Sequence, residues 1–261
     1  MDLGLNGKRA LVLGSSQGIG AEIARVLARE GCDVYVGARR LDHIQSLADE
    51  LSEEFNVDAK AYSIDLSDGI SVEKLCEMIT HEWKIDILLN NAGGPPPSSS
   101  TGVPDEIWES SLQSLLMSTI RLSEAAVKGM RERGWGRILT VASSGVIQPI
   151  PNLAVSNTVR SAVVGFTKTL SNEVAKDGIT VNMVLPGRID TERLASIHKA
   201  SANKQGMTYE EFRDNSRSSI PARRFGTAKE FAEVAVFLMS VCASYITGSV
   251  IRVDGGVIQS V

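Results

Sequence analysis

Near the start of the chain, three glycines follow a short apolar run, in the stretch Leu13-Gly14-Ser15-Ser16-Gln17-Gly18-Ile19-Gly20. In this context Gly14 allows a tight turn, Gly18 lets backbone approach a pyrophosphate, and Gly20 lets a helix pack closely against a strand. The helix that begins there presents N–H groups and the positive end of its dipole to phosphates. We therefore predict a dinucleotide-binding loop made of Gly14, Ser15, Ser16, Gln17, Gly18, Ile19 and Gly20.

A pair of cations, Arg39 and Arg40, follows the second apolar run. An acidic residue at this place would accept hydrogen bonds from the ribose 2′-hydroxyl of NAD and would repel a 2′-phosphate. Two arginines instead suit a phosphate, which a guanidinium binds in a bidentate way. We therefore expect NADP(H) in preference to NAD(H). The alternative interpretation is a solvated basic pair at the end of a strand.

Further motifs follow in a fixed order along the chain. They are Asp65-Leu66, Asn90-Asn91-Ala92-Gly93, Pro186-Gly187-Arg188-Ile189-Asp190-Thr191, Ile246-Thr247-Gly248 and Val253-Asp254-Gly255-Gly256. Together with the GxxxGxG spacing of the glycine loop, they resemble the classical short-chain dehydrogenase/reductase family over the whole chain. One departure is Leu13, where that family usually has Thr, and we expect it to leave cofactor binding intact.

The resemblance implies a nicotinamide-dinucleotide site and assigns further residues to it. In the family, the Asp-Leu pair contacts the adenine ring, and the Thr of the PGxIxT motif holds the nicotinamide carboxamide. The residues that the resemblance adds to the glycine loop and the arginine pair are Asp65, Leu66, Asn91, Ala92, Gly93, Arg160, Pro186, Gly187, Ile189 and Thr191.

The family's catalytic set is an Asn, a Ser, a Tyr and a Lys, and this chain departs from it at three positions. Ser143 matches the Ser. Thirteen residues later, at the Tyr position, stands Ser156, and four residues further, at the Lys position, stands Arg160. The Asn position falls on Leu115. The downstream stretch Gly165-Phe166-Thr167-Lys168 matches the family and fixes this register.

These replacements change the acid–base chemistry of the predicted site. A phenol with a pKa of about 10 can be tuned toward neutrality by a cation, whereas a serine hydroxyl is a poor proton donor. Ser156 also reaches less far than a Tyr. Arg160 keeps a positive charge but stays protonated and cannot relay protons. Leu115 removes a polar link from the proton path.

Three functions are compatible with this pattern. In the first, which we favour, the protein is an NADP(H)-dependent short-chain oxidoreductase that acts on a carbonyl or hydroxyl group by an altered proton route. Ser143 and Ser156 would bind the substrate oxygen, and Arg160 would stabilise the developing alkoxide. In the second, it is a nicotinamide-dinucleotide-binding sensor or a catalytically silent subunit. In the third, the same fold carries a non-redox elimination or dehydration.

The polar segment 191–222 follows another strand and is predicted to form a lid over the substrate site. Arg188, His198 and Tyr209 lie in or near it and are candidates to deliver the proton. Arg188 adds a charge beside the nicotinamide region, which suggests an anionic substrate. For each of the three, the competing interpretation is surface packing or a solvated or paired charge.

The elements that must position these residues are short apolar runs that alternate with helical stretches. The runs are rich in Val, Ile and Leu without strict alternation, as in a parallel sheet covered on both faces. They are Arg9–Gly14, Asp33–Ala38, Asp58–Ile64, Ile85–Asn90, Arg137–Ala142, Thr180–Leu185 and Val250–Asp254. Helical spacing over Ile19–Glu30 and Val159–Lys176 indicates right-handed crossovers. We predict an α/β fold, a Rossmann-type doubly wound parallel sheet of about seven strands in one domain, residues 1–261.

Composition limits the function classes. The 261 residues are 43% hydrophobic and 22% charged, which is typical of a globular α/β domain. The net charge of −4 argues against a general nucleic-acid binder. No apolar run is long enough for a membrane span, and the three cysteines are scattered as in a reducing compartment, so we expect a cytoplasmic protein. The three histidines have no metal-ligand spacing, and we expect no metal site.

The resemblance also implies a homo-oligomer, a tetramer or a dimer. Family members pair through helices that correspond here to 104–133 and 159–176 and through a strand at 250–254. Apolar residues in these helices that could form such an interface, or could instead face the sheet, are Leu112, Leu116, Val163 and Phe166.

Overall fold

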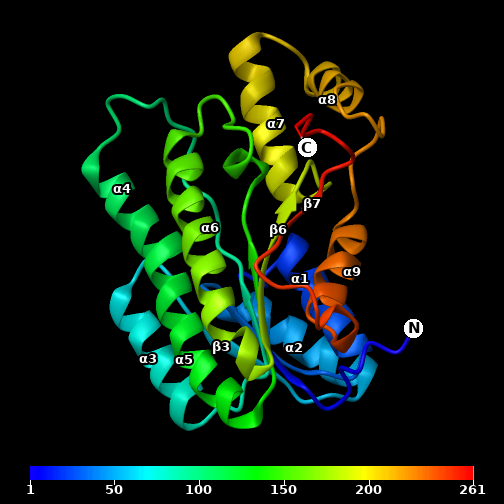
Figure 1. Cartoon of the computed structure of the whole chain (residues 1–261). Coiled ribbons are helices and arrows are strands. Elements are labelled where there is room, and N and C mark those ends of the chain that lie inside the picture. The colour runs from blue at the N-terminus through cyan, green and yellow to red at the C-terminus, as the bar shows by residue number, and fades with distance from the viewer. Residues whose placement is uncertain (261) are drawn as a thin grey trace.

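The computed structural model describes residues 1–260, and its centre is a single parallel sheet of seven strands (Figure 1). The strands lie in the order β3-β2-β1-β4-β5-β6-β7. Their bounds are β1 Arg9–Leu13, β2 Asp33–Ala38, β3 Ala59–Ser63, β4 Ile87–Asn90, β5 Gly136–Val141, β6 Ile179–Pro186 and β7 Val250–Val253. The predicted doubly wound fold is confirmed, and every predicted strand boundary lies within two residues of the observed one.

Helices cover both faces of this sheet (Figure 1). One face carries α1, α2 and α9, and the other carries α3, α5 and α6. The helices are α1 Gly18–Arg29, α2 Leu41–Phe55, α3 Gly69–His81, α4 Asp105–Ser111, α5 Ser118–Arg133, α6 Ala154–Val174, α7 Glu192–Gln205, α8 Tyr209–Ser218 and α9 Ala228–Leu238. A π-helical segment, Leu112–Met117, joins α4 to α5. Across residues 1–260, no helix combines the length and apolar character needed to cross a bilayer.

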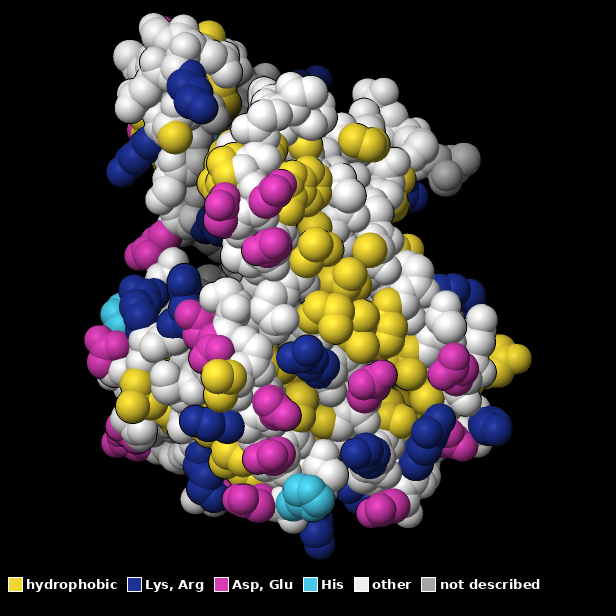
Figure 2. All heavy atoms as spheres, turned by 90° about the vertical axis from the view of Figure 1, so that its left-hand side faces the viewer, with side chains coloured by type: hydrophobic (Ala, Val, Ile, Leu, Met, Phe, Trp, Pro, Cys, Tyr) yellow, Lys and Arg dark blue, Asp and Glu magenta, His cyan; other side chains and the backbone are white. Residues whose placement is uncertain are grey.

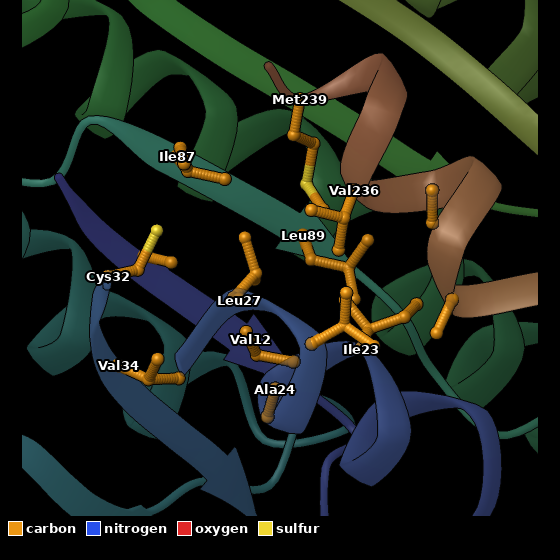
Figure 3. Close-up of a cluster of buried hydrophobic side chains, with 14 of the residues drawn as sticks. Val12, Ile23, Ala24, Leu27, Cys32, Val34, Ile87, Leu89, Val236 and Met239 are labelled. Atoms are coloured by element: carbon orange, nitrogen blue, oxygen red, sulfur yellow. The ribbon is translucent and has the colours of Figure 1, made fainter. Parts of the chain in front are cut away.

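The central strand β1 is buried from both sides. Successive side chains of a strand point to opposite faces. Val12 therefore packs with Leu27 of α1 and Val236 of α9 (Figure 3), whereas Leu11 and Leu13 pack into the cluster under α3 and α5. Burying each such side chain contributes about 1.5–3 kcal/mol. Two apolar layers thus hold β1 in place and fix where the loop after it begins.

The strand order reverses between β1 and β4. The chain runs outward from β1 to β2 and β3, and then returns to β4 on the other side of β1. In open α/β sheets, such a reversal leaves a crevice outside the carboxyl ends of the strands. Gly14 directly follows β1 and Asn91 directly follows β4. The fold therefore brings the predicted phosphate loop and the NNAG motif to the same place.

After β6 the chain makes a two-helix excursion, α7 and α8, which projects beyond the sheet (Figure 1). Its base is closed by a hydrogen bond of 2.8 Å from the N–H of Asp190 to the carbonyl of Gly226. The Thr191 hydroxyl begins α7 by accepting from the Leu194 N–H at 3.3 Å. The predicted lid segment therefore forms a helical unit of its own, and its closure over a substrate stays a prediction.

Candidate active site

The glycine loop has the backbone that a phosphate-binding turn requires. Gly14 has a φ of +63°, and a Cβ there would lie 2.6 Å from the carbonyl oxygen of Asn91. A Cβ on Gly20 would lie 2.2 Å from the Gly14 carbonyl oxygen. Gln17 precedes α1 and does not cap it with its side chain. The first N–H groups of α1 are therefore available to phosphate oxygens, as the sequence predicts.

Hydrogen bonds to two strands anchor this loop. Asn91 Nδ2 donates to the Gly14 carbonyl at 3.3 Å. The N–H and the hydroxyl of Ser15 both donate to the Gly37 carbonyl, at 3.3 and 3.4 Å. Leu13 is fully buried in the apolar core. The loop is thus fixed to the ends of β2 and β4 without the hydroxyl that the family usually has at Leu13.

Arg39 and Arg40 are exposed just beyond the carboxyl end of β2. Arg40 Nη2 donates to Gln17 Oε1 at 2.6 Å, which brings its charge beside the start of α1. Neither arginine takes part in an ion pair within residues 1–260. Two such cations next to a phosphate loop suit a 2′-phosphate on the adenosine ribose.

Asp65 follows β3 and makes its bonds locally. Its carboxylate accepts from the hydroxyl of Ser67 at 2.7 Å and from the N–H of the same residue at 2.9 Å. These two hydrogen bonds hold the pKa of Asp65 below its usual value, and the bond from the Ser67 hydroxyl has the larger effect. The side chain of Asp65 therefore stabilises the turn after β3, and the adenine contact of Asp65 and Leu66 stays a prediction.

The turn after β6 reaches toward the glycine loop. Gly187 packs so closely against the C-terminal segment that a Cβ there would lie 2.5 Å from Asp254 Cα. Ile189 is buried, and the methyl group of Thr191 lies 3.5 Å from where a Cβ on Gly18 would be. The PGxIxT motif is thus held at the crevice, with Thr191 facing the phosphate loop.

Arg160 of α6 is a buried cation. Only 8% of the surface of this residue is exposed. Nη1 donates to the carbonyl of Val141 at 3.0 Å and Nη2 to the carbonyl of Ala92 at 3.1 Å. Burial first, and then the charge of Arg193, lower the pKa of Arg160 to about 10, which keeps it charged at neutral pH. Two neutral carbonyls hold this charge, which makes its burial costly.

The two serines that the sequence predicts as catalytic lie after β5 and in the first turn of α6. Ser143 follows β5, and its hydroxyl accepts from a backbone N–H two residues on at 3.2 Å, which leaves its proton available. Ser156 lies in the first turn of α6, one turn before Arg160, and is 7% exposed. Asn157, which the sequence did not single out, donates to the carbonyl of Ile150 at 2.9 Å and so fixes the loop after Ser143 to α6.

Leu115 makes the neighbourhood of Arg160 partly apolar. It lies in the π-helical segment and packs against Val155 and Val159 of α6. Beside it is a cavity with a free volume of 10 Å³, which matches about one water molecule. The polar residues that line this cavity are Asn90, Asn91, Ser118, Thr119, Thr140 and Arg160. The Oδ1 atom of Asn90 is buried there without a hydrogen-bond partner in residues 1–260.

Arg193, in the first turn of α7, is a site residue that the sequence did not predict. Its Nη2 donates to the carbonyl of Gly94 at 3.4 Å. The same atom lies 2.9 Å from where a Cβ on Gly94 would be, and Arg160 Nη2 lies 3.8 Å from that point. The only signal in the sequence is that Arg193 stands two residues after the PGxIxT motif, and spacing says nothing about where its side chain points.

Arg188 turns away from this point. Its Nη1 donates to the carbonyl of Ser216 at 2.9 Å and also to the hydroxyl of Ser219. Arg188 therefore holds the end of α8 against the turn after β6. This contact favours the interpretation of Arg188 as a packed charge over its role as a substrate ligand.

His198 and Tyr209 make their contacts with the lid segment and with Phe225 just after it. The His198 ring is buried between Phe212 and Phe225, with ring centroids 5.3 and 5.6 Å away. The Tyr209 hydroxyl accepts from Arg213 at 3.2 Å. Both side chains thus stabilise the packing of α7 and α8, and a role in proton delivery stays a prediction.

The fold and the crevice define a class, the Rossmann-type dinucleotide-binding proteins. A family model described as enoyl-(acyl carrier protein) reductase matches residues 14–258. The 3-oxoacyl-(acyl-carrier-protein) reductase FabG of Escherichia coli strain K12 is 34% identical over 257 residues, which are 97% of this chain and 98% of that protein. The chain belongs to the classical short-chain dehydrogenase/reductase family.

Solved structures of similar sequence share the whole fold. L-sorbose reductase from Gluconobacter frateurii, in complex with NADPH and L-sorbose, has a TM-score of 0.94 and 34% identity, with 100% of both chains covered. A variant of the actinorhodin polyketide ketoreductase with NADPH has a TM-score of 0.90 and 33% identity, with 97% of this chain and 98% of that chain covered. Both neighbours were solved with the phosphorylated dinucleotide.

Proposed function

We propose that this protein is an NADP(H)-dependent short-chain oxidoreductase that acts on a carbonyl or hydroxyl group. The observation that carries the proposal is the crevice itself: a phosphate loop opens onto the uncapped start of α1, with Arg40 beside it. The reductases among its relatives, and the neighbours solved with NADPH, support the same cofactor and the same class of reaction.

The catalytic set in this proposal is Ser143, Ser156 and Arg160. Ser156 and Arg160 take the positions that the family fills with Tyr and Lys, and Leu115 takes the position of its Asn. When bound, NADPH supplies a hydride to the carbonyl carbon. Ser143 and Ser156 donate hydrogen bonds to the carbonyl oxygen, and the charge of Arg160 stabilises the alkoxide that forms there.

The proton for the alkoxide comes from solvent water in this proposal. A serine hydroxyl gives up its proton only if it is replaced at once, so Ser156 passes a proton on and does not act as the acid itself. Arg160 stays protonated at neutral pH. The polar cavity beside Leu115 and Asn90 has room for about one water molecule, which supports a short water path behind Arg160.

The test is a binding experiment followed by a turnover experiment. NADPH fluorescence titration should show tight binding, and a panel of aldehydes, ketones and oxo acids should include compounds that drive NADPH oxidation. Binding of NADPH without oxidation by any member of the panel would contradict the oxidoreductase and favour the silent subunit. Failure of NADPH to bind would reject both functions.

We further propose that the protein works in the cytoplasm as a homo-oligomer. Its three cysteines are unpaired, with Cys32 buried and Cys242 exposed, which suits a reducing compartment. The family resemblance supports the oligomer.

A further inference from the structure

Two guanidinium groups from different elements meet above one glycine. Arg160 extends from α6 and Arg193 from the first turn of α7. Their Nη2 atoms lie 3.8 and 2.9 Å from the point where a Cβ on Gly94 would be. A Cβ at this position would come too close to Arg193 Nη2, so the missing side chain of Gly94 is what allows the two guanidinium groups to approach the same point.

The two cations have no counter-ion among the residues that the structure describes. Within residues 1–260, neither Arg160 nor Arg193 forms an ion pair. Arg160 is almost wholly buried, and the nearby charge that acts on it is another cation. Arg193 is exposed, so solvent screens part of its repulsion with the buried Arg160, and an anion between the two guanidinium groups would offset the rest.

Some other arginines of this part of the chain are paired, whereas Arg188 and Arg223 form no ion pair within residues 1–260. Arg213 bonds Asp190 at 2.8 Å and Arg224 bonds Glu230 at 2.6 Å. The acids Asp190 and Glu230, which stand just outside the lid segment, are thus taken by other arginines, and neither pairs with Arg193. An acid that arrives with the substrate would complete the arrangement.

We propose that Arg193 and Arg160 bind the carboxylate of a short oxo acid or hydroxy acid. This inference rests on the proposed function and names its substrate class. Ser156 lies one turn from Arg160 on the same helix, so the reacting oxygen and the carboxylate would be held a few bonds apart. A guanidinium presents five N–H donors, and Arg160 uses two of them on carbonyls, which leaves others for a carboxylate.

The competing anion is the cofactor's own diphosphate. That group would bind at a separate site, at the uncapped N–H groups of α1 and the left-handed backbone of Gly14 and Gly18. Arg193 instead bonds the carbonyl of Gly94, in the loop after β4. The position of Arg193 therefore favours the substrate over the diphosphate.

The experiment compares acids with their neutral esters. Pyruvate, 3-oxobutanoate and 4-oxopentanoate are assayed for NADPH oxidation beside their methyl esters, with wild type, Arg193→Gln and Arg217→Gln. Arg217 is the matched control, since it is an exposed lid arginine paired with Asp214. We expect at least one acid to exceed its ester in kcat/KM, and Arg193→Gln to lower kcat/KM for that acid by about 10- to 100-fold. Arg193→Gln should leave kcat/KM for the ester and the affinity for NADPH unchanged. Arg217→Gln should have the same kcat/KM as wild type for both the acid and the ester.

A second readout separates this inference from the proposed function. The NADP⁺-loaded protein is titrated calorimetrically with butyrate, methyl butyrate and inorganic phosphate. If butyrate binds to wild type and binds more weakly to Arg193→Gln, the carboxylate site is supported. If, in addition, no carbonyl compound is turned over, only the proposed function is rejected. Turnover that is equal for acids and esters would overturn the inference and leave the oxidoreductase standing. Weaker NADPH binding in Arg193→Gln, or tighter binding of phosphate than of butyrate, would also overturn it.

Discussion

At the scale of single residues, Arg160 determines what this active site can do. A guanidinium is planar and can bond two carbonyls at once, which Arg160 does with Val141 and Ala92. It also remains charged where an amine could lose its proton. In the mechanism that we propose, Arg160 therefore gives fixed electrostatic stabilisation to an alkoxide and leaves proton transfer to water and the serine hydroxyls.

Replacement of Arg160 by Met should separate stability from function. Desolvation of a buried charge without a counter-ion costs several kcal/mol, and its removal offsets the loss of the hydrogen bonds to the Val141 and Ala92 carbonyls, each worth about 0.5–1.5 kcal/mol. We expect the free energy of unfolding of Arg160→Met, measured by urea denaturation, to be no lower than that of wild type. We expect its kcat to fall at least about 10-fold. A large loss of stability, with kcat unchanged, would mean that Arg160 is only structural.

The arginine pair after β2 should decide between the two dinucleotides. Each charge-assisted hydrogen bond to a 2′-phosphate is worth about 1.5–3 kcal/mol. The double variant Arg39→Gln, Arg40→Gln should therefore bind NADPH at least about 10-fold more weakly and bind NADH as wild type does. The two affinities are measured by fluorescence titration. Arg25→Gln, which removes an arginine of α1 that pairs with Glu50, is the control. Equal losses for NADPH and NADH would contradict the assignment.

Sequence spacing predicted which residues follow each strand, and it could not predict where long side chains point. Arg188 and Arg193 both lie near the PGxIxT motif. The sequence suggested Arg188 as the cation near the substrate, yet Arg188 bonds the end of α8 and Arg193 lies beside Arg160. The direction of such a long side chain depends on partners from distant segments, here Ser216 for Arg188 and Gly94 for Arg193. No local sequence pattern identifies these partners.

At the scale of elements, the sheet was predictable because both of its faces are buried. Runs rich in Val, Ile and Leu mark most of the strands, and the predicted bounds differ from the observed ones by no more than two residues. The edge strand β3, Ala-Lys-Ala-Tyr-Ser, is the exception and is only partly buried. Helix α6 was harder, because it begins at Ala154, five residues before the predicted start. Its first turn contains Ser156 and Asn157, polar residues that resemble a loop in the sequence.

The lid helices carry a titratable group that should make their docking sensitive to pH. Burial lowers the pKa of His198 from 6.5, and Arg188 and Arg213 lower it further against the opposing effect of Asp190. The neutral ring bonds the hydroxyl of Ser216 at 3.2 Å. Because the folded pKa is depressed, the unfolded lid binds more protons, so this stabilisation is complete above 6.5 and is lost as the pH falls toward the folded pKa.

Hydrogen exchange of α7 and α8 should therefore speed up between about pH 7 and about pH 5, after correction for intrinsic rates. In His198→Phe, which keeps an aromatic ring between Phe212 and Phe225, the pH dependence should disappear. His43→Phe is the control, since His43 is exposed on α2. A pH dependence that survives in His198→Phe would assign the effect to another group.

At the scale of the whole molecule, one face is unusually apolar. Figure 2 shows hydrophobic side chains gathered across the middle of the face toward which α3, α4 and α5 lie in Figure 1. Leu112 is 40% exposed, whereas Val163 is buried within the monomer and offers nothing to a partner. Leu112→Glu should shift the protein to a smaller assembly in sedimentation velocity, and Ile197→Glu, on the lid, should not. An unchanged mass for Leu112→Glu would place the interface elsewhere.

The cofactor crevice joins the two halves of the sheet, so its occupation should stabilise the entire chain. The half that contains β1, β2 and β3 contributes Gly14 and Arg40, and the half that contains β4 to β7 contributes Asn91 and Thr191. NADPH at about 100 times its Kd adds about 2.7 kcal/mol, which corresponds to a rise in Tm of roughly 5–10 °C for a chain of this size.

In the same thermal melts, NADH at equal concentration should give a smaller shift, because it has no 2′-phosphate for the arginine pair. Gly14→Ala should melt earlier than wild type, since an alanine at a φ of +63° would be strained and its Cβ would lie 2.6 Å from the Asn91 carbonyl. It should also lose the NADPH shift. A Gly14→Ala variant that melts as wild type and keeps the full shift would show that the phosphate site lies outside this loop.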